Sequence, residues 1–308
     1  MVRDLHELPK LRDSLSYVYV EHAVVNRKDS AVEFIDKEGC VMIPVAALAV
    51  LMLGPGTRIT HAAVRVLADN GCTIVWTGED GTQCYAQGLG ETRKAYHLLH
   101  QAEWASDAQK RMQVVLRMYA RRFGYDLDPS LSLPQVRGLE GVRVREAYAE
   151  ASERYHVLWS GRRYDRQDWG RGDPINRALS AANALLNGLC HSGIVAGGYS
   201  PAIGFIHTGK QLSFVYDIAD LYKAEITIPV AFQTVAESDA YVEKRVRMAC
   251  RERFRESKLL QRILPDIDHV LGITEEMLRS SEADVDEDSG CPEPLWSPLL
   301  EVSEEAGT

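Results

Sequence analysis

Two aspartates and a histidine lie close together in the segment 207–220, which reads HTGKQLSFVYDIAD. Asp217 and Asp220 stand in an otherwise apolar and aromatic run, where burying a carboxylate costs several kcal/mol unless a positive group meets it. If the run is helical, the two carboxylates are neighbours at i and i+3 and repel one another unless a cation neutralises them. The pattern therefore indicates a cation site. In the alternative, Asp217 caps a helix start and Asp220 pairs with Lys223.

A glutamate in an earlier segment is also predicted to lie in apolar surroundings. Glu140 lies in the run RGLEGVRVREAY, and a helix over this run places it on one stripe with Val136 and Val144. A glutamate on an apolar stripe is unusual. Either it pairs with Arg137 or Arg143 one turn away, or it serves a functional site.

The four candidate side chains are Glu140, His207, Asp217 and Asp220. His207 follows the apolar run AIGFI and precedes a glycine turn, so it is either a structural histidine or a ligand or general base. Mixed carboxylate and imidazole ligands suit Mg²⁺ or Mn²⁺ better than a closed structural zinc site. A divalent ion in an open site polarises a phosphodiester oxygen. The sequence lacks the motifs of P-loop NTPases, zincins, α/β-hydrolases and dinucleotide-binding enzymes.

Acidic charge is concentrated at the C-terminus. Residues 272–308 contain eleven Asp and Glu and one Arg, so the rest of the chain is close to neutral although the whole carries a formal net charge of -9. Residues 240–262 contain eight Lys and Arg against three Glu, which suits either a phosphate backbone or an ordinary solvated helix face. Six scattered cysteines without a CxxC pair, and the lack of a signal-peptide or transmembrane pattern, favour a cytoplasmic protein.

The chain divides into a strand-rich N-terminal part and a helical remainder, which predicts an α+β fold. Residues 15–88 are expected to hold strands and one short helix ending at Gly71, with a glycine-punctuated connector over 79–91. The predicted units are a β-rich domain over 1–89, an α-helical catalytic domain over 90–272 and an acidic flexible tail over 273–308.

Helical periodicity runs through most of the second part. The expected helices cover 93–123, 132–155, 173–189 and 240–264. Ser132 and Gln135 stand at capping-box spacing, and Asp173 is an expected N-cap before Pro174. The helix over 240–264 is predicted to be basic and amphipathic.

Around the four candidate side chains and in several other runs, the sequence resembles the CRISPR-associated endonuclease/integrase family Cas1, of the subtype I-E kind. The resemblance extends from about residue 15 to 270 and carries long, specific runs. The matching runs are PGTRITHAAV (55–64), RGLEGVRVR (137–145), GRRYDRQDW (161–169), GYSPAIGFIHTGK (198–210) and LSFVYDIAD (212–220). It implies a small N-terminal β-domain, which serves dimerisation and DNA contact, joined to a larger helical catalytic domain.

The resemblance also implies a site and a reaction. The family's metal ligands fall on Glu140, His207 and Asp220, with Asp217 as a further catalytic residue, and the expected ion is Mg²⁺ or Mn²⁺. The reaction is insertion of a short DNA fragment, the prespacer, into the CRISPR repeat during spacer acquisition. A 3′-hydroxyl attacks a phosphodiester directly, and with water the same site acts as an endonuclease.

The expected partners are double-stranded DNA and other protein chains. The family acts as a homodimer, two of which flank a Cas2 dimer in a heterohexameric integration complex, and no membrane is involved. The positions expected to contact DNA are Arg58, Arg65, Arg162, Arg163, Tyr164, Lys210, Lys223, Arg247 and Arg251.

Two other functions use the same residues and stay open at this point. One is a metal-dependent DNA repair nuclease that does not integrate. The other is a catalytically silent DNA-binding scaffold, which the intact set of Glu140, His207 and Asp220 argues against.

Overall fold

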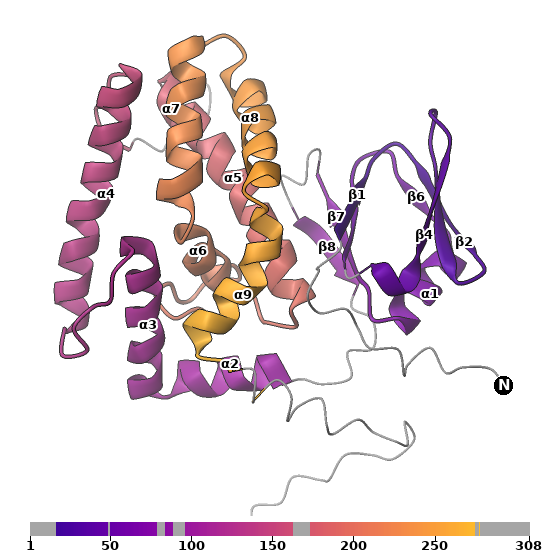
Figure 1. Cartoon of the computed structure of the whole chain (residues 1–308), viewed down its shortest axis with the longest axis horizontal. Helices are drawn as coiled ribbons and strands as arrows, with labels where there is room; N and C mark the ends of the chain where they lie inside the picture. The colour runs from indigo at the N-terminus through magenta and orange to yellow at the C-terminus, as the bar shows by residue number, and fades with distance from the viewer. Residues whose placement is uncertain are drawn as a thin grey trace, which may run out of the picture. The chain divides into compact units, whose positions relative to one another are not determined.

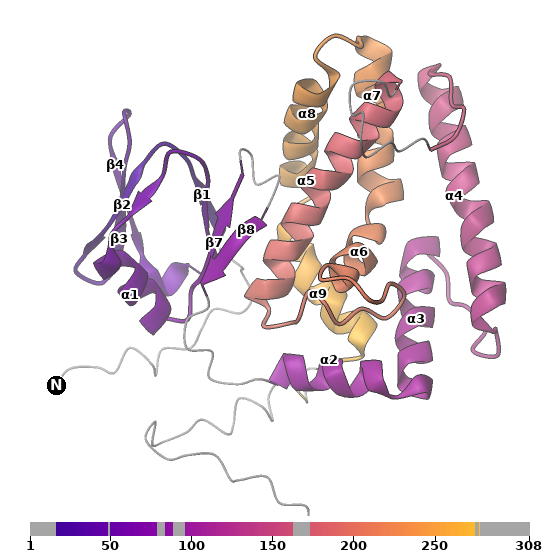
Figure 2. The same cartoon turned by 180° about the vertical axis from the view of Figure 1, so that it is seen from behind.

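The computed structural model describes residues 17–48, 50–78, 84–88, 96–162, 173–274 and 277. Contacts divide the chain into two compact units, Met1–Gly272 and Ile273–Thr308. The first unit has strands in its N-terminal part and helices after it, as an α+β fold does (Figures 1 and 2). The predicted boundary near residue 89 and nearly all of the acidic tail lie outside the described residues. Within those residues, no helix combines the length and the apolar character needed to cross a membrane.

In the described part of the chain, the strands form two four-stranded sheets. The first has the order β1-β5-β7-β8 and is parallel except for the β7–β8 pair, and the second has the order β4-β3-β2-β6 and is antiparallel except for the β2–β6 pair. The strands are β1 (Tyr17–Val20), β2 (Val24–Lys28), β3 (Ala31–Ile35), β4 (Cys40–Pro44), β5 (Val50–Leu53), β6 (Arg58–Ile59), β7 (Thr73–Thr77) and β8 (Cys84–Gly88).

The two sheets and helix α1 (His61–Asp69) enclose an apolar core that includes Val25, Leu51 and Leu67. Val32 and Phe34 alternate inward along β3, as expected for a strand with one buried face, whereas β5 is buried at every position. Thr60 caps α1 by accepting the backbone N–H of Ala63 at 3.3 Å. The predicted short helix is confirmed, and strand β7 follows it.

The predicted connector over 79–91 is wrong for residues 84–88, which form β8. This short strand pairs with β7, with Val75 opposite Gln87 and Trp76 opposite Ala86. The run CYAQG has little strand preference of its own, so its conformation is decided by the hydrogen bonds that β7 offers.

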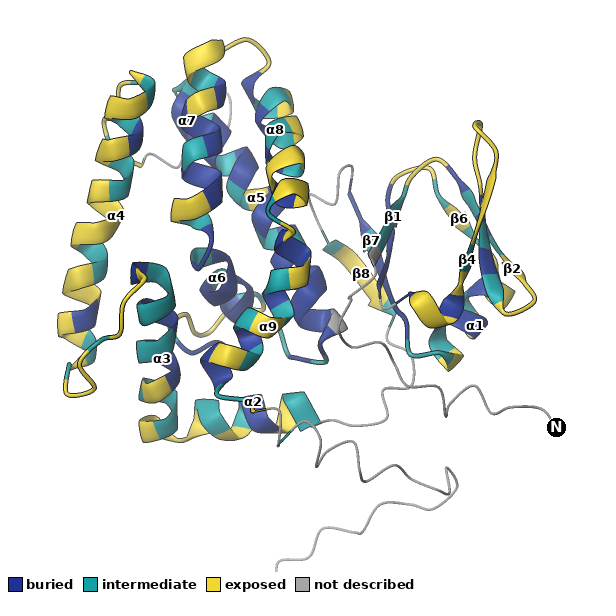
Figure 3. Cartoon of the chain, in the orientation of Figure 1, coloured by how far each residue is buried: buried dark blue, intermediate teal, exposed yellow. Residues whose placement is uncertain are grey.

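The helices of the second part pack around α5. Helix α5 contacts α6, α7, α8 and α9 and is buried along most of its length, whereas α4 is exposed along one side (Figure 3). A Cβ on Gly193 would lie 2.7 Å from a side-chain carbon of Ile263, and one on Gly197 would lie 2.5 Å from Leu264, so glycines let α9 approach. The elements are α2 (Tyr96–Ser106), α3 (Ala108–Phe123), α4 (Leu133–Tyr155), α5 (Pro174–Ala196), α6 (Ser213–Asp220), the π-helical η4 (Lys223–Thr227), α7 (Ile228–Glu237), α8 (Val242–Glu256) and α9 (Leu259–Leu271).

Both predicted caps are confirmed, but two predicted helices are each divided. Asp173 accepts the N–H of Asn176 at 2.8 Å, and the capping box at the start of α4 forms. Asp107 ends the run of α2 and caps α3, because its carboxylate accepts two N–H groups of the following turn at 2.8 Å. Lys258, in a left-handed conformation with φ 49°, separates α8 from α9. Helical periodicity continues across both breaks, so it does not reveal them.

Candidate active site

Asp217 is fully buried in α6 and binds the loop that precedes this helix. Its Oδ2 accepts the N–H groups of Phe205 (2.6 Å) and Ile206 (3.1 Å), and its Oδ1 accepts the N–H of His207 at 2.9 Å. The Nδ1 of His207 lies 2.7 Å from the same Oδ1. Four donors therefore surround this carboxylate, which explains how it is buried without an ion. It does not cap the helix start, a position held by Leu212.

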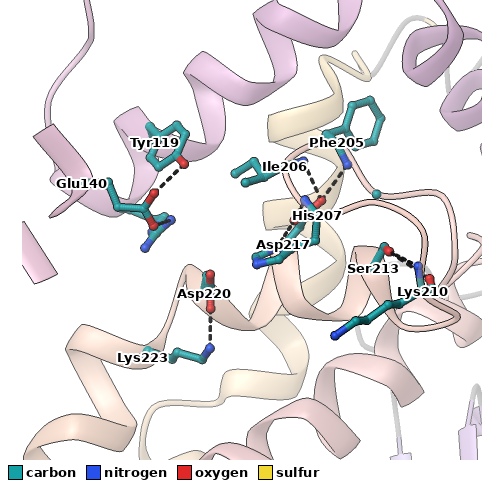
Figure 4. A network of polar contacts seen from close by, with 12 residues as sticks. Tyr119, Glu140, Phe205, Ile206, His207, Lys210, Ser213, Asp217, Asp220 and Lys223 are labelled. Atoms are coloured by element: carbon teal, nitrogen blue, oxygen red, sulfur yellow. Dashed lines mark hydrogen bonds and ion pairs between the residues drawn. The ribbon is translucent and has the colours of Figure 1, made fainter. Parts of the chain in front are cut away.

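The His207 ring is oriented by this contact. A carboxylate only accepts hydrogen bonds, so Nδ1 carries the proton and Nε2 is the nitrogen left to bind a ligand. The hydrogen bond to Asp217 raises the pKa of His207, partial burial opposes the rise, and the carboxylate of Asp220 adds to it. The imidazole is half-exposed and faces the space between α4 and α6 (Figure 4).

Glu140 is held by two residues of α3. The hydroxyl of Tyr119 donates to Oε2 at 2.6 Å, and the guanidinium of Arg122 lies 2.7 Å from Oε1. The cationic partner is therefore neither Arg137 nor Arg143, the two neighbours on its own helix. The side chain is 25% exposed, so Glu140 borders the core and can still reach a ligand.

Asp220 ends α6 and pairs with Lys223 in η4. The lysine Nζ lies 2.5 Å from Oδ1, as one alternative from the sequence predicted. The contact is an ion pair only, because the buried Oδ1 accepts no hydrogen bond from the described residues.

The three proposed ligands come from three different elements and turn toward a common space (Figure 4). Two carboxylates and one imidazole form a donor set that fits Mg²⁺ or Mn²⁺. In the described residues no three His, Cys, Asp or Glu side chains stand close enough together to hold a metal ion. Glu140 and Asp220 are each paired with a cationic side chain instead, so the arrangement has the chemistry for a metal but not its closed geometry.

The residues missed by sequence reasoning are those of α3. Tyr119 and Arg122 contact Glu140, and Arg111 donates to the loop that carries His207, at the carbonyls of Gly204 and Phe205. No sequence signal marks them, because each contact joins segments far apart in the chain.

The segment η4, which carries Lys223, is fastened to α9. Glu225 accepts two hydrogen bonds from the guanidinium of Arg262, both at 2.8 Å. This forked contact lowers the pKa of Glu225 from its ordinary value of 4.5. The Glu225–Arg262 pair is a structural contact, and replacing Glu225 tests how much it stabilises the packing of η4 against α9.

We expect Glu225→Gln to lower the free energy of unfolding by about 0.5–1 kcal/mol at pH 7, a modest amount because both side chains are partly exposed. The pKa is lower in the folded protein, so the stabilisation is present above pH 4.5 and is lost as the pH falls through the folded-state value. Thermal unfolding should show a Tm about 1–4 °C below wild type at pH 7, with a gap that closes in acid. Glu252→Gln, at a more exposed ion pair with Arg255, should change Tm less. If the Tm difference between Glu225→Gln and wild type stayed the same in acid, the stabilisation would not be electrostatic.

Three of the expected DNA contacts are exposed basic side chains. Arg58 lies in β6, Arg65 on α1 and Lys210 in the loop before α6. Arg65 makes only a loose ion pair with Asp69 at 3.6 Å. The exposure of these side chains lets them meet a phosphate backbone, whereas Lys223 is engaged with Asp220.

Arg162 has a structural contact in addition to its predicted role. Its guanidinium donates to the side chain of Asn176 at 2.8 Å and to the hydroxyl of Ser180 at 2.9 Å, which ties the preceding segment to the start of α5. Arg163 and Tyr164 lie outside the described residues.

Arg247 and Arg251 lie one turn apart on α8 and are half-buried. Several other basic residues of this region pair with acids, which is what the ordinary solvated-face interpretation predicts. These pairs are Arg245–Glu237, Arg253–Glu256, Arg255–Glu252 and Arg262–Glu225.

Comparison with known families gives a match over most of the chain. Residues 16–125 and 120–244 match the family described as CRISPR associated protein Cas1. A relative from Thermus thermophilus named CRISPR-associated endonuclease Cas1 2 is 54% identical over 308 residues, covering 99% of this chain and 93% of the relative. The CRISPR-associated endonuclease Cas1 of Escherichia coli is 44% identical over 272 residues, covering 88% of this chain and 89% of its own length.

Solved structures agree with these relatives. The crystal structure of a TtCas1–DNA complex superposes with a TM-score of 0.80 at 56% identity, covering 87% of this chain and all of the other. A casposase bound to its integration product has a TM-score of 0.58 at 13% identity, a likeness of fold alone.

Proposed function

This chain belongs to the CRISPR-associated Cas1 family, and from that premise we propose that it is a divalent-metal-dependent DNA endonuclease and integrase of CRISPR adaptation. The proposal rests on one observation above all. Glu140, His207 and Asp220, which come from three separate elements, face one space with a donor set suited to Mg²⁺ or Mn²⁺ (Figure 4). The names of its relatives support a nuclease.

The proposed reaction is a direct transesterification. The 3′-hydroxyl of the incoming prespacer attacks a phosphodiester at the edge of the CRISPR repeat, a new P–O bond forms, and the repeat strand leaves with its own 3′-hydroxyl. Glu140, His207 through Nε2 and Asp220 would hold the ion, with Asp217 keeping the His207 ring in place. The ion, when bound, stabilises the charge that develops on the phosphate oxygens.

The proposed partners follow from the family. We propose binding to double-stranded DNA, which the solved complex of TtCas1 with DNA supports. We also propose that Arg58, Arg65 and Lys210 are among the residues that contact it. Homodimers would flank a Cas2 dimer in a heterohexameric complex. The subtype I-E-like assignment also stays a proposal, since the Escherichia coli relative is 44% identical and the Thermus thermophilus relative 54%.

The test is strand transfer of a labelled duplex with 3′-hydroxyl ends into a supercoiled plasmid bearing the repeat. The reaction contains the full chain and Cas2, with Mn²⁺, Mg²⁺ or a chelator. Joined product that depends on the metal is the expected result. Nicking without joining would favour the repair nuclease, and tight DNA binding without any chemistry would favour the scaffold.

A further inference from the structure

Helix α3 supplies no proposed ligand, yet it contacts Glu140 and the loop that carries His207. Arg111, Tyr119 and Arg122 are spaced by eight and three residues, which places them within about 80° of one another around a helix of 3.6 residues per turn. The face of α3 that carries them meets Glu140 at one end and the His207 loop at the other.

At the first end, Tyr119 and Arg122 hold the Glu140 carboxylate between them. Tyr119 is fully buried, and burial together with the hydrogen bond to Glu140 raises its pKa, so the phenol keeps its proton and donates. The guanidinium of Arg122 lies over the Tyr119 ring at 5.2 Å and is itself only 12% exposed. One carboxylate oxygen is therefore held by a hydrogen bond from a buried tyrosine, and the other by an ion pair with a nearly buried arginine.

At the second end, Arg111 holds the loop that carries His207. Its guanidinium donates to the carbonyls of Phe205 (2.8 and 2.9 Å) and Gly204 (3.1 Å). Asp217 accepts the N–H groups of the same loop, so the backbone is held on both its acceptor and its donor sides. A Cβ on Gly204 would lie 2.3 Å from the His207 carbonyl, which shows how tightly the loop folds back.

We infer that α3 is the positioning helix of the site, with Tyr119 directing Glu140 and Arg111 directing His207. Groups that orient the ligands of a metal are a general requirement, and their loss typically weakens metal binding about 10–100-fold. The inference rests on the proposed function, because it takes Glu140 and His207 to be ligands.

The chain offers a matched control for Tyr119. Tyr222 is also fully buried, its hydroxyl donates to Asp266 at 2.8 Å, and Asp266 is likewise paired with an arginine, Arg121, at 3.2 Å. Tyr119→Phe and Tyr222→Phe therefore remove the same kind of bond from the same kind of surroundings. Only the first acts on a proposed ligand.

The experiment titrates Mn²⁺ into the full chain without DNA by calorimetry and records Tm without metal. Both phenylalanine variants should lower Tm by similar amounts, but only Tyr119→Phe should weaken Mn²⁺ binding, by about 10-fold. Arg111→Lys keeps the positive charge but cannot make the several hydrogen bonds of the guanidinium to the Gly204 and Phe205 carbonyls. It should weaken Mn²⁺ binding to a similar degree, whereas Arg121→Lys should not. Equal Mn²⁺ affinity in Tyr119→Phe and Tyr222→Phe, or tighter binding in Tyr119→Phe, would overturn the inference.

Glu140→Ala separates this inference from the proposed function. If Glu140→Ala binds Mn²⁺ as wild type does, the ligand assignment itself is wrong, and the inference falls with it. If Glu140→Ala loses binding while Tyr119→Phe and Tyr222→Phe behave alike, the ligand assignment stands and the positioning role of Tyr119 is overturned.

Discussion

Replacing Asp220 with alanine is expected to lower the initial rate of strand transfer by about 10³-fold or more. The carboxylate is one of three proposed ligands, and a metal supplies several kcal/mol of transition-state stabilisation. A loss of about 4 kcal/mol corresponds to about three powers of ten in rate. The measurement is the joining of labelled 3′-hydroxyl DNA to the repeat-bearing plasmid in Mn²⁺ with Cas2.

The fold should survive this change. Lys223, the residue that loses its partner, has a side chain that is 32% exposed and can turn to water. We therefore expect the Tm of Asp220→Ala to lie within about 2 °C of wild type, because such a pair contributes about 0–1 kcal/mol. Asp239→Ala removes an exposed aspartate between α7 and α8 and should integrate as wild type does. Normal integration by Asp220→Ala would refute the ligand assignment and revive the scaffold interpretation.

Replacing Asp217 with alanine is expected to act on stability first. It leaves the N–H groups of Phe205, Ile206 and His207 without their acceptor. Each unsatisfied buried donor costs about 1–3 kcal/mol, less where water reaches it, so the total is about 3–5 kcal/mol. In thermal unfolding without metal, the Tm should fall by about 10 °C.

Asparagine variants separate the two aspartates. Asp217→Asn retains one acceptor oxygen and turns an amide toward N–H donors, so it should lower Tm nearly as much as alanine does. Asp220→Asn should leave Tm almost unchanged while strand transfer is lost. A stable Asp217→Asn variant without strand transfer would contradict the anchoring role and indicate that Asp217 binds the ion directly.

Local signals in the sequence predicted several elements correctly. The cap at Asp173 and the capping box of Ser132 and Gln135 operate within one turn, so their residues are neighbours in any helix that forms there. Strand β8 and the divisions at Asp107 and Lys258 were not predicted. Strand β8 forms because it pairs with β7. The two helices are divided by local turns, across which the apolar periodicity of the sequence continues.

The candidate residues themselves could be read from the sequence, because carboxylates and a histidine within apolar runs are unusual wherever the chain folds. What each of them does depends on contacts between distant segments. The sequence left Glu140 with Arg137 or Arg143 as partners, and the fold pairs it with Arg122 and Tyr119 of another helix. Asp217 and Asp220 look alike three residues apart, yet one is enclosed by four donors and the other forms an ion pair with Lys223. A sequence determines which groups are costly to bury, whereas only the tertiary structure decides which partner meets each of them, since that depends on which helices lie side by side.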